Sequence, residues 1–239
     1  MDNIKLLGIF KERNFGLTGI ISVLILTLII GLLAFKTRND QWNVWKLNKD
    51  ITFYNNSPLL STADGPYFLN QAKYLNENKP VSFQLEKRFF PGYAQGSSSK
   101  KINNNLSIFN ISLLPISINY FSIFFDNDLL LTANKIIPIT ALITAILIAV
   151  FFIILGFGYE GVIAGLGASL SQSIYVRTSV GRVDTDLLNI GMFYLILGLI
   201  LASIKVEDNR NKLALICMAG FFNFLFAWWY QHPGFLFPF

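Results

Sequence analysis

Long runs of uncharged, mostly apolar residues alternate with short polar segments along this chain. An α-helix needs about 20 residues to cross about 30 Å of membrane hydrocarbon. Five uncharged runs approach or exceed that length, and each predicts a transmembrane helix. They are residues 15–35, 136–159, 161–176, 187–204 and 213–230. The pattern therefore predicts an all-α fold, a polytopic helical membrane protein with about five transmembrane helices.

The second and third predicted spans form a helical hairpin. Residues 161–176 are rich in Gly, Ala and Ser, and such small side chains let two helix backbones approach closely. The segment Gly-Phe-Gly-Tyr-Glu-Gly at 156–161 matches the dinucleotide-binding fingerprint letter for letter. A long apolar segment precedes it, however, where that fingerprint requires a short strand. We interpret residues 156–161 as a tight turn between two spans.

One further uncharged run, residues 106–125, is interpreted as an interfacial helix because it contains Pro115 and several polar side chains. If it does not span, the N-terminal segment and residues 205–212 lie on one side, with three basic residues each. The positive-inside rule favours that arrangement. Residues 36–135 then form a long first external loop with interfacial helices. The 177–186 turn and residues 230–234 lie on the same outer face.

Composition agrees with a lipid bilayer as the chain's solvent. The 239 residues are 53% hydrophobic and 14% charged, with a mean hydropathy of +0.50, whereas soluble domains are about 25% charged. This balance excludes an ordinary soluble enzyme and a disordered chain. The 19 Lys and Arg residues give a net charge of +5 but form no basic run, so no nucleic-acid partner is expected.

Metal and nucleophile chemistry is limited by the scarcity of cysteine and histidine. The chain has one of each, Cys217 and His232. It therefore cannot form an internal disulfide, a Cys/His zinc cluster or a Cys/His nucleophilic pair by itself. Any metal bound by this chain must use carboxylate ligands.

Three acids and one arginine are the candidate functional residues. Asp184 and Asp186 end the segment Arg177-Thr-Ser-Val-Gly-Arg-Val-Asp-Thr-Asp at the mouth of a span. Both carboxylates can face one hard cation if the backbone there is extended or turning, and Arg177 can hold a phosphate or orient the acids. Asp64 precedes Gly-Pro at a predicted helix start in the first external loop. The simpler alternative is that the acids cap helix N-termini and Arg177 snorkels.

Taken together, three motifs resemble the catalytic subunit of oligosaccharyltransferase, most closely the single-subunit bacterial enzyme of PglB type. They are the Asp-Gly helix start at Asp64, the Arg-Thr-x-x-Gly-x-x-Asp-Thr-Asp segment at 177–186, and Trp-Trp-Tyr at 228–230. The resemblance covers about residues 15–234. It implies a fold of the class-C glycosyltransferase (GT-C) kind. It also implies glycan transfer from a polyprenyl-pyrophosphate-linked oligosaccharide to Asn in an Asn-x-Ser/Thr acceptor polypeptide.

Site roles follow from the resemblance. Asp64 and Asp184 would bind Mg2+ or Mn2+, Asp186 would lie in or next to the metal shell, and Arg177 would support that shell or the pyrophosphate. Arg182 and Val183 depart from the aromatic or small residues that often stand there in the family. The protein would lie in a bacterial or archaeal plasma membrane with its active face outward.

The family pattern extends beyond residue 239. Its later external loop, remaining spans and soluble C-terminal acceptor-recognition domain have no counterpart in these residues. We therefore expect the chain to be the N-terminal part of a GT-C membrane domain, incomplete and inactive by itself.

Two alternatives stay open. The first is another GT-C glycosyltransferase that uses a polyprenyl-phosphate sugar; the 177–186 motif argues against it. The second is a non-catalytic membrane scaffold or part of a transporter. Against a transporter, no charged residue lies inside a predicted span, where coupling and substrate sites usually place one.

Overall fold

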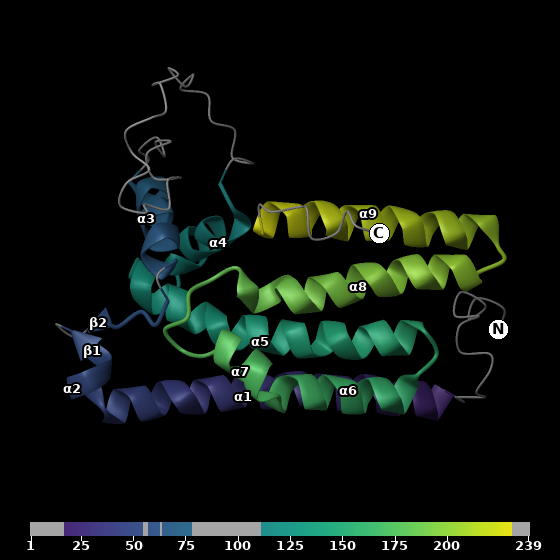
Figure 1. Cartoon of the computed structure of the whole chain (residues 1–239), viewed down its shortest axis with the longest axis horizontal. Helices are drawn as coiled ribbons and strands as arrows, with labels where there is room; N and C mark the ends of the chain where they lie inside the picture. The colour runs from purple at the N-terminus through teal and green to yellow at the C-terminus, as the bar shows by residue number, and fades with distance from the viewer. Residues whose placement is uncertain (1–16, 55–56, 63, 78–110, 231–239) are drawn as a thin grey trace, which may run out of the picture.

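The computed structural model describes residues 17–54, 57–62, 64–77 and 111–230, and these residues are almost entirely helical. Their one strand pair is a short antiparallel ladder of β1 (Phe53–Tyr54) and β2 (Ser57–Pro58). Helices lie side by side along a single bundle (Figure 1). They are α1 (Leu17–Leu47), α5 (Leu129–Ile154), α6 (Gly158–Leu170), α8 (Asp186–Lys205) and α9 (Asn209–Trp229).

Among the described residues, four helices are long and apolar enough to cross a membrane. They are α1, α5, α8 and α9, with 31, 26, 20 and 21 residues. At 1.5 Å per residue, even the shortest reaches about 30 Å. The chain is therefore an all-α polytopic membrane protein, as its apolar pattern predicts.

The predicted span at 161–176 differs, because the structure divides it into two helices. The 13-residue α6 is followed by the six-residue α7 (Gln172–Arg177), with an extended backbone at Ser171 between them. Alone, α6 rises about 20 Å, which is less than the hydrocarbon thickness. The Ser169 carbonyl near the break accepts a hydrogen bond from the Arg38 guanidinium, so a side chain of α1 supports this helix end.

The first helix also differs from its predicted span, because α1 continues well past residue 35. Its last turns carry Lys36, Arg38 and Asp40. Lys36 pairs with Asp40 one turn later on the exposed face, while Arg38 is fully buried in the protein. Contacts with the rest of the protein thus support the polar C-terminal part of α1, so the helix can continue beyond its apolar run.

The predicted hairpin of closely packed helices is confirmed at α5 and α6. Gly156 makes the turn between them with a φ of 97°. A methyl group on Gly161 would lie 2.7 Å from the Ala149 carbonyl oxygen, and one on Gly165 would lie 2.9 Å from that of Ala145. The backbones are therefore too close for larger side chains at these two positions.

Short helices lie across one end of the bundle. After the one-turn α2 (Lys49–Thr52), the chain forms α3 (Gly65–Asn76) and α4 (Leu113–Ser122). With ten residues, α4 is too short to cross a membrane, in line with its predicted interfacial position; residues 106–110 of that prediction lie outside the described residues. An apolar core joins these short helices to α5, α8 and α9. Its members include Phe68, Leu114, Ile118, Ile137, Leu187 and Trp229.

The helices alternate in direction, and this gathers the polar loops. The C-terminal ends of α1, α6 and α9 lie toward the same end of the bundle as the N-terminal ends of α5 and α8 (Figure 1). The loop before α3, the 177–186 segment and Tyr230 therefore meet at one end of the bundle. The α8–α9 connection lies at the other end. Residues 231–234, predicted to lie on the same face, are outside the described residues.

Candidate functional site

The loop between α7 and α8, residues 178–185, forms the centre of the site. Gly181 adopts a φ of 82°, a left-handed backbone conformation that glycine accommodates without strain. Its carbonyl accepts a hydrogen bond of 2.8 Å from the Ser61 amide. The Thr62 hydroxyl donates a longer bond of 3.4 Å to the Val183 carbonyl. The segment before Asp64 is therefore bonded to the segment before Asp184.

Asp64 stands at the start of α3, with a proline in the first turn, as predicted. Its side chain makes no capping hydrogen bond to that turn. Instead, the Thr62 hydroxyl accepts the bond from the Gly65 amide at 3.2 Å. The Asp64 side chain therefore does not cap α3 through a hydrogen bond.

Asp184 lies in the loop and is partly buried. Burial raises the pKa of its carboxyl group, and the negative charges of Asp186 and Asp64 raise that pKa further. A hydrogen bond with Thr185 and the positive charge of Arg182 act in the opposite direction. Asp184 is thus close enough to both other acids for their charges to act on it, and a cation near Asp184 would relieve this repulsion.

Asp186, the first residue of α8, is held by neighbouring polar side chains. One carboxylate oxygen forms an ion pair with Arg177, with Arg182 at 3.9 Å from the same oxygen. The other accepts a hydrogen bond of 3.2 Å from the Asn189 amide. Arg177 therefore orients Asp186. This is one of the two roles expected from its sequence position, the other being to hold a phosphate.

The structure does not gather all three acids into one group of metal ligands. Within the described ranges, no three His, Cys, Asp or Glu side chains are arranged to hold a metal ion. Thr185, between the two acids, has helical backbone angles (φ −67°, ψ −18°). Residues two apart on a helical backbone point in different directions. The arrangement of the described residues therefore gives no three-acid site, and whether Asp184 and Asp186 face one cation stays a prediction.

Two of the acids, Asp64 and Asp184, are the residues that could hold a magnesium-type cation. Mg2+ commonly takes only one or two carboxylates from the protein and completes its shell with water and substrate phosphate. Asp64 and Asp184 interact electrostatically and belong to segments that hydrogen bonds hold together. These two residues would hold the ion, while Asp186 stays with Arg177. Whether a metal binds there remains a prediction.

The Trp-Trp-Tyr motif reaches the same loop from the end of α9. The Trp229 indole donates a hydrogen bond of 2.6 Å to the carbonyl of Thr185, the residue between the two acids. The Trp228 indole donates one of 2.9 Å to the carbonyl of Ile111. Tyr230 stacks on Phe226. All three segments of the family resemblance therefore meet at one place.

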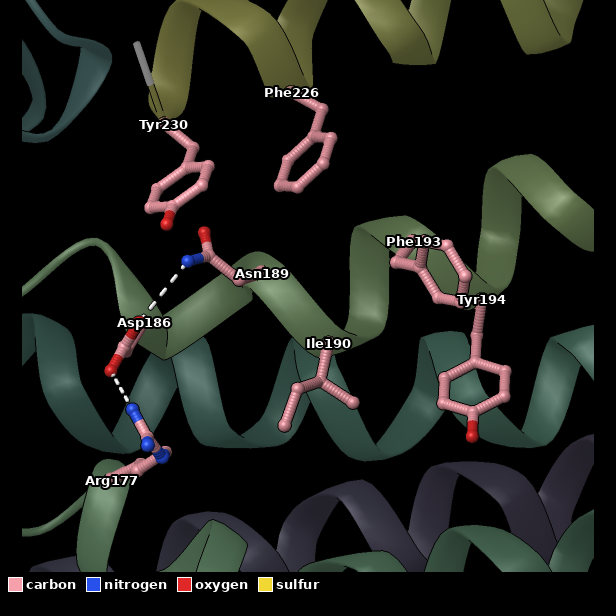
Figure 2. Close-up of a pocket in the computed structure, with 8 residues that line it drawn as sticks. All are labelled: Arg177, Asp186, Asn189, Ile190, Phe193, Tyr194, Phe226 and Tyr230. Carbon is pink, nitrogen blue, oxygen red and sulfur yellow. Dashed lines mark hydrogen bonds and ion pairs between the residues drawn. The ribbon is translucent and has the colours of Figure 1, made fainter. Parts of the chain in front are cut away.

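A pocket of about 440 Å³ opens between α8 and α9, beside Asp186. Arg177, Asp186 and Asn189 lie together at one end, and the aromatic rings of Phe193 and Tyr194 line the other (Figure 2). The remaining lining residues are Ile190, Phe226 and Tyr230. A pocket with charged groups at one end and aromatic rings at the other suits an amphipathic molecule with an anionic headgroup.

Sequence reasoning did not identify four polar residues that support this site: Asn189, and Arg38, Gln41 and Asn134 from the bundle helices. Asn189 follows Asp186 by three residues, a spacing that places two side chains on the same face of a helix. Arg38 and Gln41 are also three apart. That spacing was the available signal for Asn189, Arg38 and Gln41. The partners that give Arg38, Gln41 and Asn134 their role are more than 40 residues away in sequence.

Comparison with known proteins gives no assignment: no family model matches the chain, and no curated protein matches it. What the chain does must be inferred from its own residues and their arrangement.

Proposed function

We propose that the chain belongs to a membrane oligosaccharyltransferase, which moves a glycan from a polyprenyl-pyrophosphate carrier to Asn in an Asn-x-Ser/Thr polypeptide. One observation carries this proposal. Three motif segments, at Asp64, at 177–186 and at 228–230, are far apart in the sequence but meet at one end of the helix bundle. Capping acids on unrelated helices would have no reason to be joined in this way.

The chemistry of the residues suits that reaction. Transfer breaks the bond between the sugar C1 and the pyrophosphate oxygen and forms a bond from C1 to the Asn amide nitrogen. The nitrogen loses one proton to solvent, and the lipid pyrophosphate leaves. Asp64 and Asp184 would bind Mg2+ or Mn2+ and orient the acceptor amide. The cation supplies Lewis-acid stabilisation of the leaving pyrophosphate.

Arg177 and the neighbouring pocket suit the donor. Arg177 is half exposed and lines the charged end of the pocket, so its guanidinium can contact a ligand there as well as Asp186. A guanidinium forms strong paired hydrogen bonds with phosphate oxygens. The aromatic residues of the pocket lining offer apolar surface in the same pocket as that charge. We place this site on the outward face of a bacterial or archaeal plasma membrane.

A GT-C enzyme that uses a polyprenyl-phosphate sugar is the second candidate. The observation in its favour is the engagement of Asp186 by Arg177 and Asn189, which leaves two acids near the loop centre. Two carboxylates also suit an enzyme that transfers a single sugar to a hydroxyl acceptor. The two candidates differ in donor and in acceptor atom.

Transfer by the intact protein, expressed from its complete reading frame, tests the proposal. The purified protein in lipid nanodiscs would receive a polyprenyl-pyrophosphate-linked oligosaccharide, Mn2+ and a fluorescent Asn-x-Thr peptide. We expect a glycopeptide that disappears with EDTA and with a Gln-x-Thr peptide. A polyprenyl-monophosphate sugar should not replace the donor. Product from the monophosphate donor alone would favour the second candidate, and no product from either donor would overturn both.

A further inference from the structure

A fully buried arginine lies inside the bundle near the candidate site. Arg38, on α1, is 0% exposed. Its guanidinium donates hydrogen bonds to the Thr178 hydroxyl at 2.8 and 3.1 Å and to the Ser169 carbonyl at 2.8 Å. It also lies over the ring of Tyr175, 4.5 Å from the centroid. In the described part of the chain it forms no ion pair.

A buried charge without a counter-ion is unfavourable unless hydrogen bonds satisfy it. All of the distant partners of Arg38 lie on one stretch of chain, the end of α6, α7 and the first residue of the loop after α7. The arginine therefore connects α1 to the base of the loop that carries Asp184.

Two amide side chains hold the next part of the same loop. The Gln41 side-chain oxygen, one helical turn after Arg38, accepts a hydrogen bond of 3.0 Å from the Val180 amide. The Asn134 side-chain oxygen on α5 accepts one of 2.8 Å from the Gly181 amide. Asn134 is 1% exposed, so water does not readily replace this bond. Backbone donors in a buried loop require such partners.

Gly181 connects this support to the second acid. Its amide is bound by Asn134, and its carbonyl is bound by the amide of Ser61, three residues before Asp64. Val180 and Val183 are buried on either side of it. A displacement of Gly181 would therefore move the segments that carry Asp184 and Asp64 together.

We propose that Arg38, Gln41 and Asn134 form a polar clasp that positions Asp184 and, through Gly181 and Ser61, Asp64. The existence of the clasp does not depend on the proposed function, whereas its effect on glycan transfer rests on that function. These three residues are positioning residues, because Gln41 and Asn134 bind backbone amides of the loop and Arg38 binds the Thr178 hydroxyl and the Ser169 carbonyl at its base. The clasp explains why positions 38, 41 and 134 of the bundle helices carry polar side chains, although apolar side chains could pack there.

Hydrogen exchange on the intact protein in nanodiscs tests the clasp without any substrate. Gln41→Leu removes the acceptor for the Val180 amide, whereas Gln41→Glu keeps an oxygen at the half-buried position. Loss of one hydrogen bond should speed exchange in peptides covering 178–183 by about tenfold in the Leu variant. Hydrogen exchange in peptides from α8 and α9 should not change, and exchange at 178–183 in Gln41→Glu should stay close to the wild-type rate. Unchanged exchange at 178–183 in Gln41→Leu would overturn the clasp.

Transfer kinetics test whether the clasp serves the reaction. We expect Arg38→Met and Gln41→Leu to lower kcat at least about tenfold and to raise the Mn2+ concentration needed for half-maximal rate, with the peptide KM unchanged. Arg38→Lys and Gln41→Glu should recover part of the rate. Lys36→Met, on the exposed face of the same helix, is the matched control and should keep the wild-type rate.

Two outcomes separate the clasp from its alternatives. A lower unfolding temperature with unchanged kcat per folded molecule would show a purely structural role and overturn the positioning role. Absence of transfer in the wild type would overturn the proposed function and the catalytic consequence of the clasp, while hydrogen exchange would still decide whether the clasp exists.

Discussion

At the scale of single residues, Arg177 illustrates how a side chain can matter little for stability and still matter for binding. Its ion pair with Asp186 is partly solvated, with the arginine side chain 53% exposed. Such pairs usually contribute less than about 1 kcal/mol to folding. The pair nevertheless keeps a guanidinium at the charged end of the pocket, where the proposed anionic headgroup would bind.

Arg177→Gln should therefore weaken donor use more than it weakens the fold. Loss of a charge-assisted hydrogen bond costs about 1.5–3 kcal/mol. We expect the KM for the lipid-linked donor to rise at least about tenfold. The change in unfolding temperature should be small. Steady-state transfer rates at varied donor concentration measure the first effect, and thermal unfolding in detergent measures the second.

Arg210→Gln is the matched control for that measurement. Arg210 is exposed in the first turn of α9, at the end of the bundle away from the site. Its loss should leave the donor KM unchanged. An equal rise in KM in both variants would mean that the net charge of the protein, and not the position of the Arg177 guanidinium beside the pocket, determines donor binding.

The sequence identified the acids but not their individual partners. Alternation of spans across the membrane brings Asp64 and the 177–186 segment to one end, so their proximity could be predicted. Arg177 forms its ion pair with Asp186, and the sequence does not reveal which of the two acids it would contact. Asn134 could not be identified either, because its partner at Gly181 is 47 residues away.

At the scale of elements, the contact between α5 and α6 depends on glycine. A methyl group on Gly161 would overlap the Ala149 carbonyl, whereas one on Gly167 of the same helix would meet nothing within 4 Å. The two positions therefore form a matched pair for testing helix packing in this bundle.

Gly161→Ala should destabilise the protein, and Gly167→Ala should not. Overpacking costs about 1–3 kcal/mol, while alanine in an exposed helix position gains up to about 1 kcal/mol over glycine. Thermal unfolding of the two variants in detergent, followed by intrinsic fluorescence, measures the difference. Equal unfolding temperatures would contradict the close approach of α5 and α6.

The presence of the long helices could be predicted from the lengths of the apolar runs, whereas the residues at which the helices end could not. The membrane requires about 20 apolar residues, and that requirement is visible as uncharged runs. Beyond residue 35, α1 continues because protein contacts satisfy Arg38 and Gln41. The division of 161–176 at Ser171 likewise depends on contacts from α1, which no local pattern reveals.

At the scale of the whole molecule, alternating helix directions separate the two ends of the bundle. The site, together with exposed Asp50 on α2, lies at one end, and exposed Glu207 lies at the other. The N-terminal segment and residues 205–212 carry the positive charge that favours the cytoplasmic side. We therefore predict that the site end faces outward.

Labelling of single cysteines tests this orientation in intact cells. In a Cys217→Ser background, Asp50→Cys should react with a membrane-impermeant maleimide added outside. Glu207→Cys should react only after the membrane is permeabilised. Reaction of Glu207→Cys from outside, with Asp50→Cys protected, would reverse the orientation. Reaction of both from one side would contradict the separation of the two ends by a membrane.

The central claim is that Asp64 and Asp184, 120 residues apart in sequence, act in one catalytic site. A double-mutant cycle with Asp64→Asn and Asp184→Asn, measured as kcat/KM for glycan transfer by the intact protein, tests it most directly. Residues that act as a unit give strongly non-additive effects. We predict a loss of at least about a hundredfold in each single variant, with little further loss in the double variant. Wild-type activity in either single variant, or losses that multiply in the double variant, would contradict the claim.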